Sequence, residues 1–190
     1  MKFNSSALFP LLMLLLLAGL TFWLERASQQ ETTVSGKTRH DPDYIVNNFT
    51  IKRFDAQGKL YQTLTANEMR HYPDDDSTEA EMPYMTYHRG LKTFINADKA
   101  WIDSGGKTIQ MERNVRVRHE SAKGPETVLT TSTLTVLSDE EIARTKAPVT
   151  ITQGGTVIHG IGLESNNKTQ ISVLGGRVQG TIEPQPKQAK

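Results

Sequence analysis

The strongest constraint on this chain is an apolar segment near its start. The 18 residues from Ala7 to Leu24 contain no charged side chain. As a helix they would extend roughly 27 Å, close to the thickness of a bilayer's hydrocarbon core. Only a helix satisfies its own backbone hydrogen bonds in that environment. The segment therefore predicts a transmembrane anchor that includes Leu8, Gly19, which could allow close helix contact, and Trp23 at the interface.

The charges on either side of the anchor predict its orientation. Lys2 and the α-amino group precede it, and Glu25 and Arg26 follow it. The positive-inside rule places residues 1–6 in the cytoplasm and the rest of the chain outside it. A cleaved signal peptide is the alternative, but its apolar region usually runs about 7–15 residues and ends at a small-residue cleavage site. This segment is longer and no clear Ala-x-Ala follows it, which favours an uncleaved anchor.

The composition beyond the anchor indicates one β-rich domain. Of 22 basic and 21 acidic side chains only Lys2 precedes Glu25, so residues 25–190 carry no net charge. Nucleic-acid-binding domains usually show a basic excess, so no such partner is expected. The absence of cysteine excludes disulfides, thiolate chemistry and cysteine-type zinc sites. Recurring Gly, Thr, Asn and Asp clusters favour many short strands.

Alternating apolar and polar residues predict strands joined by glycine or Asx turns. Tyr44–Phe54 and Leu60–Ala66 form a predicted hairpin around the turn Asp55–Gly58. Further strands are expected at 84–88, 93–103, 108–117, 127–137, 149–152, 156–163, 170–174 and 177–182. Ser138–Glu141 has the form of a capping box, which predicts one helical turn near Ile142.

These patterns predict an anchor at 7–24, a linker at 25–43, an all-β domain at 44–183 and a polar tail at 184–190. A meander, a sandwich and a jelly roll fit the strand pattern equally well.

No catalytic or metal-binding pattern stands out. The five histidines are not at helical metal-ligand spacing, and Asp74–Asp76 lacks the alternation of an EF-type loop. Gly160–Ser165 begins like a dinucleotide fingerprint, but Ser165 stands where the third glycine belongs. We expect no enzyme, metal or cofactor, although a membrane-tethered hydrolase whose triad assembles only in space stays an alternative.

The apolar faces of the predicted strands would supply one inner surface. Its members are Phe49, Ile51, Leu60, Leu64, Ile109, Met111, Val115, Val117, Leu134 and Val136. They form either an ordinary closed core or a groove that accepts acyl chains, and the pattern alone leaves both possibilities open.

The chain resembles the LptC family, the bitopic inner-membrane component of lipopolysaccharide export in Gram-negative bacteria. The similarity covers nearly the whole chain and rests on the order and spacing of several motifs. They are Phe54-Asp-Ala-Gln-Gly58, His71-Tyr-Pro73, Ala97-Asp-Lys-Ala100, Thr131-Ser-Thr-Leu-Thr-Val-Leu-Ser-Asp139, Ala147-Pro-Val149 and Gly160-Ile-Gly-Leu163. Two departures are Thr133, where an aromatic residue is expected, and Lys146, where an acidic residue is common.

The resemblance implies a twisted antiparallel β-jellyroll, open along one side, in the periplasm. Such a protein takes lipopolysaccharide from the ABC transporter LptB–LptF–LptG and passes it to the bridge protein LptA by edge-to-edge β-pairing. Exposing each acyl CH₂ to water costs about 0.8 kcal/mol, so an apolar trough would shield the lipid. No hydrolytic residue is needed, because the transporter consumes ATP. The alternative is an anchored structural adaptor with a closed core and no lipid conduction.

The resemblance also suggests roles for particular residues. The groove-lining candidates are Phe49, Ile51, Leu64, Ile109, Met111, Val117 and Leu134, and an error of one residue in register would turn each outward. The candidate partner edge comprises Ile171, Val173, Leu174, Val178 and Ile182. Gly58 and Gly155 match family glycines at turns.

Overall fold

The structure, a computed structural model, describes residues 5–28 and 40–182. It divides into two units, residues 1–39 and residues 40–190, each considered by itself. Residues 1–4, residues 29–39 of the expected linker and the tail from residue 183 onward lie outside the described residues.

The first unit contains α1 (Ser5–Ser28), which includes Leu8 and extends beyond the expected end at Leu24. The segment Phe9–Arg26 is long and apolar enough to cross a membrane by length and composition. Its side chains are exposed, with Trp23 at 65%, and a Cβ atom added to Gly19 would meet no atom within 4 Å. The helix surface is therefore available to lipid or to another helix.

The second unit is an antiparallel sheet. Its strands are β1 (Tyr44–Phe54), β2 (Leu60–Tyr72), β3 (Ser77–Glu81), β4 (Tyr84–Tyr87), β5 (Thr93–Asn96), β6 (Lys99–Ile102), β7 (Thr108–His119), β8 (Thr127–Leu137), β9 (Ile142–Gln153), β10 (Thr156–Asn166) and β11 (Ile171–Thr181). Together with α1 they confirm the predicted all-β class with an N-terminal helix.

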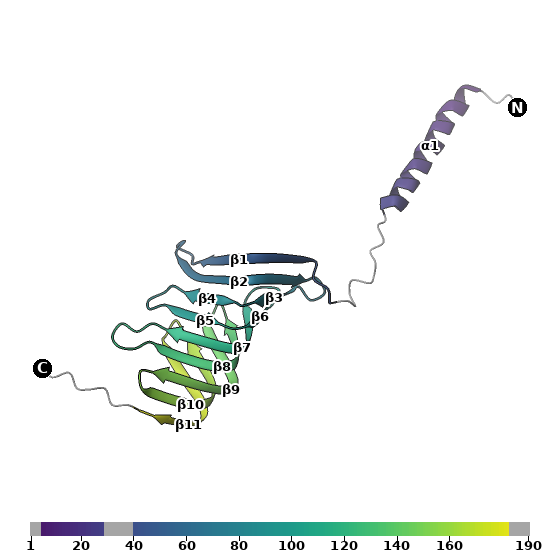
Figure 1. Ribbon diagram of the computed structural model, residues 1–190. Helices are drawn as coiled ribbons and strands as arrows, with labels where there is room; N and C mark the ends of the chain where they lie inside the picture. Colours follow the sequence, from purple (N-terminus) through teal and green to yellow (C-terminus); the bar gives the residue numbers. More distant parts are fainter. Residues whose placement is uncertain (1–4, 29–39, 183–190) are drawn as a thin grey trace. The chain divides into compact units, whose positions relative to one another are not determined.

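The strands follow one another through the sheet as a meander (Figure 1). One side of β2 pairs with β1, and its other side pairs with β3 and β4 in succession. In the same way β7 pairs with β6 along residues 109–112 and with β5 along residues 116–119. Among the described strands β1 bonds only to β2 and β11 only to β10, so the sheet has two free edges.

A line of β-bulges crosses the C-terminal half of the sheet. The register shifts between Glu112 and Val115 in β7–β8, between Thr131 and Thr135 in β8–β9, and again in β9–β10 and β10–β11. Arg113 and Asn114 take φ values of 62° and 51° at the first of these shifts. Bulges bend strands and increase twist, so a shift in four consecutive pairings bends this half of the sheet along one line.

The bulge line divides each long strand into two segments. The Gly154 wall comprises residues 115–119, 127–131, 148–153 and 156–160, extended by β5, and contains the turn at Gly154. The Glu141 wall comprises residues 108–112, 134–137, 142–145 and 163–166, extended by β6, and contains the turn at Glu141. Side chains of both walls line one cavity, so the bend folds the walls face to face.

Buried apolar side chains fill most of the space inside the folded sheet. The larger cluster extends from β1 to β8 and has Met85, Ile95, Met111, Leu134 and Val136 at its centre, each 2% exposed or less. A smaller cluster joins Leu129 and Val149 of the Gly154 wall to Leu163 of the Glu141 wall. The interior therefore packs more loosely toward the C-terminal strands than toward β1–β6.

Three sequence predictions of local structure were wrong. The expected strand 93–103 is two strands, because β5 pairs with β4 whereas β6 pairs with β3, and the strand is interrupted at residues 97 and 98. Residues 138–141 form a turn and not a helical turn, because Glu141 has φ 56° and the Ser138 N–H donates to the Lys107 carbonyl at 2.8 Å. The expected strands 170–174 and 177–182 are one strand, β11, because its pairing with β10 continues through the bulge.

Candidate functional site

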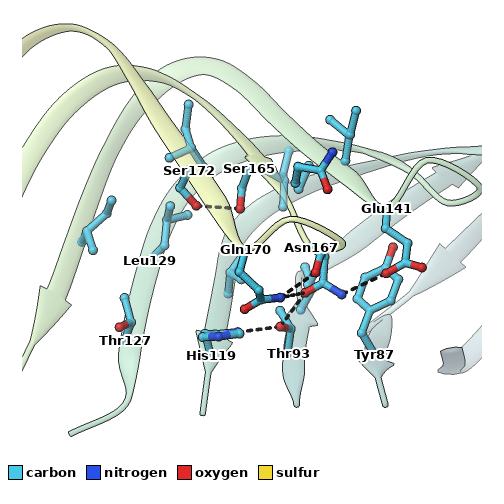
Figure 2. Close-up of a pocket in the computed structure, with 18 residues that line it drawn as sticks. Tyr87, Thr93, His119, Thr127, Leu129, Glu141, Ser165, Asn167, Gln170 and Ser172 are labelled. Atoms are coloured by element: carbon cyan, nitrogen blue, oxygen red, sulfur yellow. Dashed lines mark hydrogen bonds between the residues drawn. The ribbon is translucent and has the colours of Figure 1, made fainter. Parts of the chain in front are cut away.

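The cavity between the two walls has a volume of about 310 Å³ (Figure 2). Its apolar lining includes Ile95, Val117, Leu129, Leu134, Ile151 and Leu163, and its polar lining includes Thr93, His119, Glu141, Ser165, Asn167 and Gln170. Leu134 and Leu163 come from the Glu141 wall, whereas Val117, Leu129 and Ile151 come from the Gly154 wall. The lining thus combines an apolar interior with a polar side.

An apolar row crosses the Gly154 wall. Ile95 is opposite Val117, Val117 opposite Leu129, Leu129 opposite Ile151, and Ile151 opposite Ile158. Directly opposed residues of an antiparallel sheet point to the same face, so five neighbouring strands contribute to one continuous apolar surface. Its position inside the bend keeps much of this surface away from water.

The seven groove-lining candidates fall into two groups. Val117 and Leu134 line the 310 Å³ cavity. Leu134 also belongs to the larger core cluster, together with Phe49, Leu64, Ile109 and Met111, which do not line the cavity. Ile51 lies opposite Leu64 and is 41% exposed.

A smaller cavity of about 50 Å³ lies near β1 and β2. It is lined by Ile51, Leu64 and Ile109 together with Arg53, Gln62, Ile102 and Gly106. Five of the seven candidates therefore lie toward β1 and the core, outside the lining of the 310 Å³ cavity.

Sequence analysis missed Leu129, although it occupies the centre of the apolar row. Leu129 and Leu134 are separated by an odd number of positions and would face opposite sides of a regular strand. They share a face because the register shifts between Thr131 and Thr135. Regular alternation in the sequence carries no signal for such a shift.

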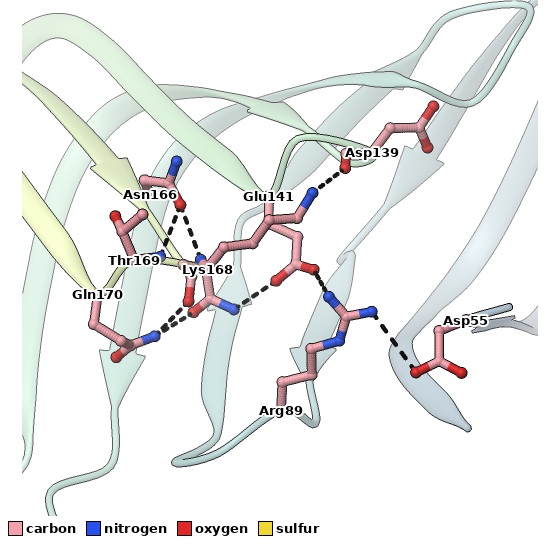
Figure 3. Close-up of polar contacts among 9 residues, drawn as sticks. Asp55, Arg89, Asp139, Glu141, Asn166, Lys168, Thr169 and Gln170 are labelled. Atoms are coloured by element: carbon pink, nitrogen blue, oxygen red, sulfur yellow. Dashed lines mark hydrogen bonds and ion pairs between the residues drawn. The ribbon is translucent and has the colours of Figure 1, made fainter. Parts of the chain in front are cut away.

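Polar groups from three turns or loops meet at one side of the cavity (Figure 3). The Glu141 side chain is 2% exposed, and its two oxygens accept hydrogen bonds from Arg89 Nη1 at 2.5 Å and from Asn167 Nδ2 at 3.1 Å. The Asn167 N–H also donates to the Glu141 carbonyl at 2.9 Å. Thr93 Oγ1 donates to Asn167 Oδ1 at 3.0 Å and contacts His119 Nδ1 at 2.7 Å. The contacts form one connected network.

The electrostatics of this network keep a neighbouring phenol neutral. The Tyr87 side chain lines the same cavity and is 3% exposed. Burial raises the pKa of Tyr87, and the nearby Glu141 carboxylate raises it further, because both disfavour a phenolate. Glu141 therefore supplies the negative charge at this side of the cavity, balanced by Arg89.

The residues expected at a partner edge lie on or beside the free strand β11. Ile171, Val173, Val178 and Ile182 are exposed at 61%, 60%, 54% and 75%, while Leu174 is half-buried opposite Leu163. The turn glycines also lie at turns. Gly58 takes φ 77° between β1 and β2, and Gly155 follows Gly154, which takes φ 59°, between β9 and β10.

Among the described residues His40, Asp74 and Asp75 bring potential metal-ligand atoms within 4.8 Å of one another. All three are exposed. The His40 ring stacks on Tyr72 at 3.9 Å and contacts Asp74 at 3.0 Å, while Asp75 accepts the Ser77 N–H at 3.0 Å. These contacts give each group a structural role at the β2–β3 turn.

A helix that is long and apolar enough to cross a membrane and a folded antiparallel sheet with an apolar interior together define a class of all-β proteins with a candidate N-terminal membrane anchor. The family model described as "Lipopolysaccharide-assembly, LptC-related" matches residues 10–183, and the chain belongs to this LptC family. The comparison with curated proteins gives no match. Family membership supports a role in lipopolysaccharide transport, as a transport component and not as an enzyme. With α1 it is consistent with a single-pass inner-membrane protein.

Proposed function

We propose that this protein accepts lipopolysaccharide from the transporter LptB–LptF–LptG between its two walls and passes it to LptA by edge-to-edge β-pairing. The observation that carries the proposal is the apolar row from Ile95 to Ile158, which continues across five strands inside the bend. Acyl chains lying along this row would be removed from water, at a gain of about 0.8 kcal/mol for each CH₂ group. The sugars would remain at the open side.

The free edge β11 supports the second half of the proposal. A strand paired on one side only can recruit a strand of another protein, because its remaining backbone groups lack partners in the sheet. The exposed Ile171, Val173 and Val178 would supply side-chain contacts to the incoming LptA strand. In this arrangement α1 crosses the inner membrane with the N-terminus in the cytoplasm, as Lys2 predicts, and contacts the transporter's helices.

Adjacent positions on β8 offer a sharp test. Leu129 is buried and lines the cavity, whereas Thr130 is exposed on the opposite face. A photoreactive amino acid at either position would be placed in the full chain, in vesicles that contain the transporter and lipopolysaccharide. We expect ATP-dependent labelling of the lipid from position 129 and little from position 130. The same photoreactive amino acid in place of Phe49 tests whether lipid also reaches the part of the interior nearest β1.

The competing function is a structural adaptor whose interior stays closed. It predicts no lipid labelling from position 129 or 49 while the transporter still binds the protein. Equal labelling from 129 and 130, or labelling without ATP, would also contradict the proposed route.

A further inference from the structure

The geometry points to a polar latch that holds the two walls together and must open before a lipid can enter, an inference that rests on the proposed function. The latch comprises Arg89 and Thr93 on one side and Glu141 and Asn167 on the other. Arg89 and Thr93 belong to the β4–β5 loop and the start of β5, while Glu141 and Asn167 belong to the β8–β9 and β10–β11 turns. No strand pairing joins these two groups among the described residues.

The latch spans the bend of the sheet. Thr93 extends the Gly154 wall, because β5 pairs with residues 116–119 of β7. Glu141 and Asn167 close the turns of the Glu141 wall. The Arg89–Glu141 contact at 2.5 Å and the Thr93–Asn167 contact at 3.0 Å therefore connect one wall to the other. Breaking both would remove these polar contacts without breaking any strand pairing, and would leave apolar packing, such as that of Leu129 and Val149 against Leu163, between the walls.

The cavity needs such a movement to hold its cargo. A volume of about 310 Å³ lies at the lower end of sites for drug-sized ligands, which span about 300–1,000 Å³. A lipid with several acyl chains is larger than a drug-sized ligand. Glu141 and Asn167 line the cavity, whereas Arg89 contacts Glu141 from outside the lining. Release of Arg89 would therefore free Glu141, which lines the cavity, to move outward with its turn.

Arg89 is suited to act as the movable part. Its side chain is 41% exposed, whereas that of Glu141 is 2% exposed. Arg89 also contacts groups outside the Glu141 wall: Asp55 of the β1–β2 turn at 3.8 Å and the ring of Tyr61 in β2 at 5.0 Å. After release, the guanidinium keeps a carboxylate and an aromatic face as partners. Glu141 then becomes accessible to water, which solvates the carboxylate that Arg89 had paired.

The test uses the absence of cysteine from the natural chain. A single cysteine at Leu129 or Leu163, both lining the cavity, would be introduced into the full chain in lipid nanodiscs. The rate of its reaction with a water-soluble thiol reagent measures opening of the cavity, and no lipopolysaccharide is needed. Two reporter positions are used so that the result does not depend on a single cysteine that itself disturbs the packing of the cavity.

The latch variants are Arg89→Ala, which removes the cation, and Glu141→Gln, which keeps the shape of the side chain and removes its charge. Arg118→Ala is the matched control. Arg118 is also 41% exposed, contacts Glu126 at 3.7 Å and lies over the Phe94 ring at 4.5 Å, but its contacts stay within β5, β7 and the loop before β8. Circular dichroism checks that each variant keeps its sheet.

We expect either latch variant to raise the reaction rate roughly tenfold or more, since a hydrogen bond to a charged group is at stake. Arg118→Ala should change the rate by less than about twofold, because surface ion pairs contribute little. Rates that are unchanged in folded Arg89→Ala and Glu141→Gln, or raised equally in Arg118→Ala, would overturn the latch. Because the assay contains no lipopolysaccharide, a faster rate combined with no labelling of lipopolysaccharide from position 129 would support the latch and contradict the proposed function.

Discussion

Gly175 of β11 lies directly against the Ile161 carbonyl of β10, where a Cβ atom added to the glycine would come within 2.6 Å of the carbonyl oxygen. Real Cβ atoms do not approach oxygen so closely, and a backbone oxygen cannot swing aside as the end of a side chain can. At the next position, Gly176, an added Cβ would meet no atom within 4 Å. The pairing of the free edge strand β11 with β10 therefore requires glycine at position 175 but not at position 176.

Replacing Gly175 with alanine should push β11 away from β10 and weaken binding of any partner strand at this edge. Gly176→Ala should leave both intact. Hydrogen exchange of the β11 amides measures detachment, and co-purification with LptA, the partner proposed for this edge, measures partner binding. Equal protection of β11 in the two variants would show that the edge tolerates the contact at Gly175.

His71 makes the start of the sheet, where Asp43 precedes β1, sensitive to pH. Its Nδ1 contacts Asp43 and its Nε2 contacts Asp76, each at 2.8 Å, and only the imidazolium can donate from both nitrogens. Hydrogen bonds with Asp43 and Asp76 raise the pKa of His71 above its ordinary value. Since the pKa is raised on folding, the stabilisation is fully present below the unfolded pKa and is lost as pH rises through the folded pKa.

The unfolding temperatures of the natural chain and of His71→Gln should therefore differ more at about pH 5.5 than at about pH 8.5, on either side of an ordinary histidine pKa. His159→Gln is the control, because the His159 ring contacts the Thr150 hydroxyl at 3.0 Å and no carboxylate is involved in that bond. If the unfolding temperatures of the natural chain and His71→Gln differ equally at both pH values, the charged contacts of His71 with Asp43 and Asp76 do not stabilise the fold.

The pKa of the buried Glu79 carboxylate depends on hydrogen bonds from its neighbours. Glu79 is 6% exposed, and it accepts hydrogen bonds from Lys99 at 2.6 Å and Tyr72 at 3.1 Å. Burial by itself would raise the pKa of Glu79, but the bonds from Lys99 and Tyr72 keep it below the usual value. Its contribution to stability is therefore present above the unfolded pKa and is lost as pH falls through the lowered folded pKa.

Lys99→Met should lower the free energy of unfolding by about 1–3 kcal/mol, because it removes the nearest cation from a buried carboxylate and leaves Arg70 at 3.5 Å as its charged neighbour. Lys59→Met, at an exposed position of the β1–β2 turn, should change it by less than about 0.5 kcal/mol. Urea denaturation of both variants near neutral pH makes the comparison. Similar losses in the two variants would mean that Lys99 contributes no more than a surface lysine.

Leu134 belongs to the closed core and also borders the cavity. It is 1% exposed, so Leu134→Ala should cost about 2–5 kcal/mol of unfolding free energy. Ile51→Ala should cost clearly less, because Ile51 is 41% exposed and loses fewer contacts. The midpoints of denaturant unfolding for the two variants test this order, and a larger loss in Ile51→Ala would show that β1 is more deeply packed than its exposure indicates.

Much of the local structure was predictable from short stretches of sequence. The predicted strands Tyr44–Phe54 and Thr127–Leu137 coincide with β1 and β8, because period-two alternation bounded by turn residues is a local property. The hairpin turn with Gly58 at positive φ is local in the same sense. The capping-box prediction at Ser138–Glu141 failed because a contact with Lys107, outside the segment, sets the backbone there.

The residue sequence by itself determined the apolar helix, the antiparallel hairpins and the family, because each follows from neighbours along the chain or from motifs in order. Only the tertiary structure decided which apolar residues face the cavity and which polar residues close it. Bulges bring Leu129 and Leu134 onto one face, and the bend they cause brings Arg89 to Glu141, 52 positions away. Both depend on how five strands shift register together, and such a shift is a property of the sheet that no single strand's pattern contains.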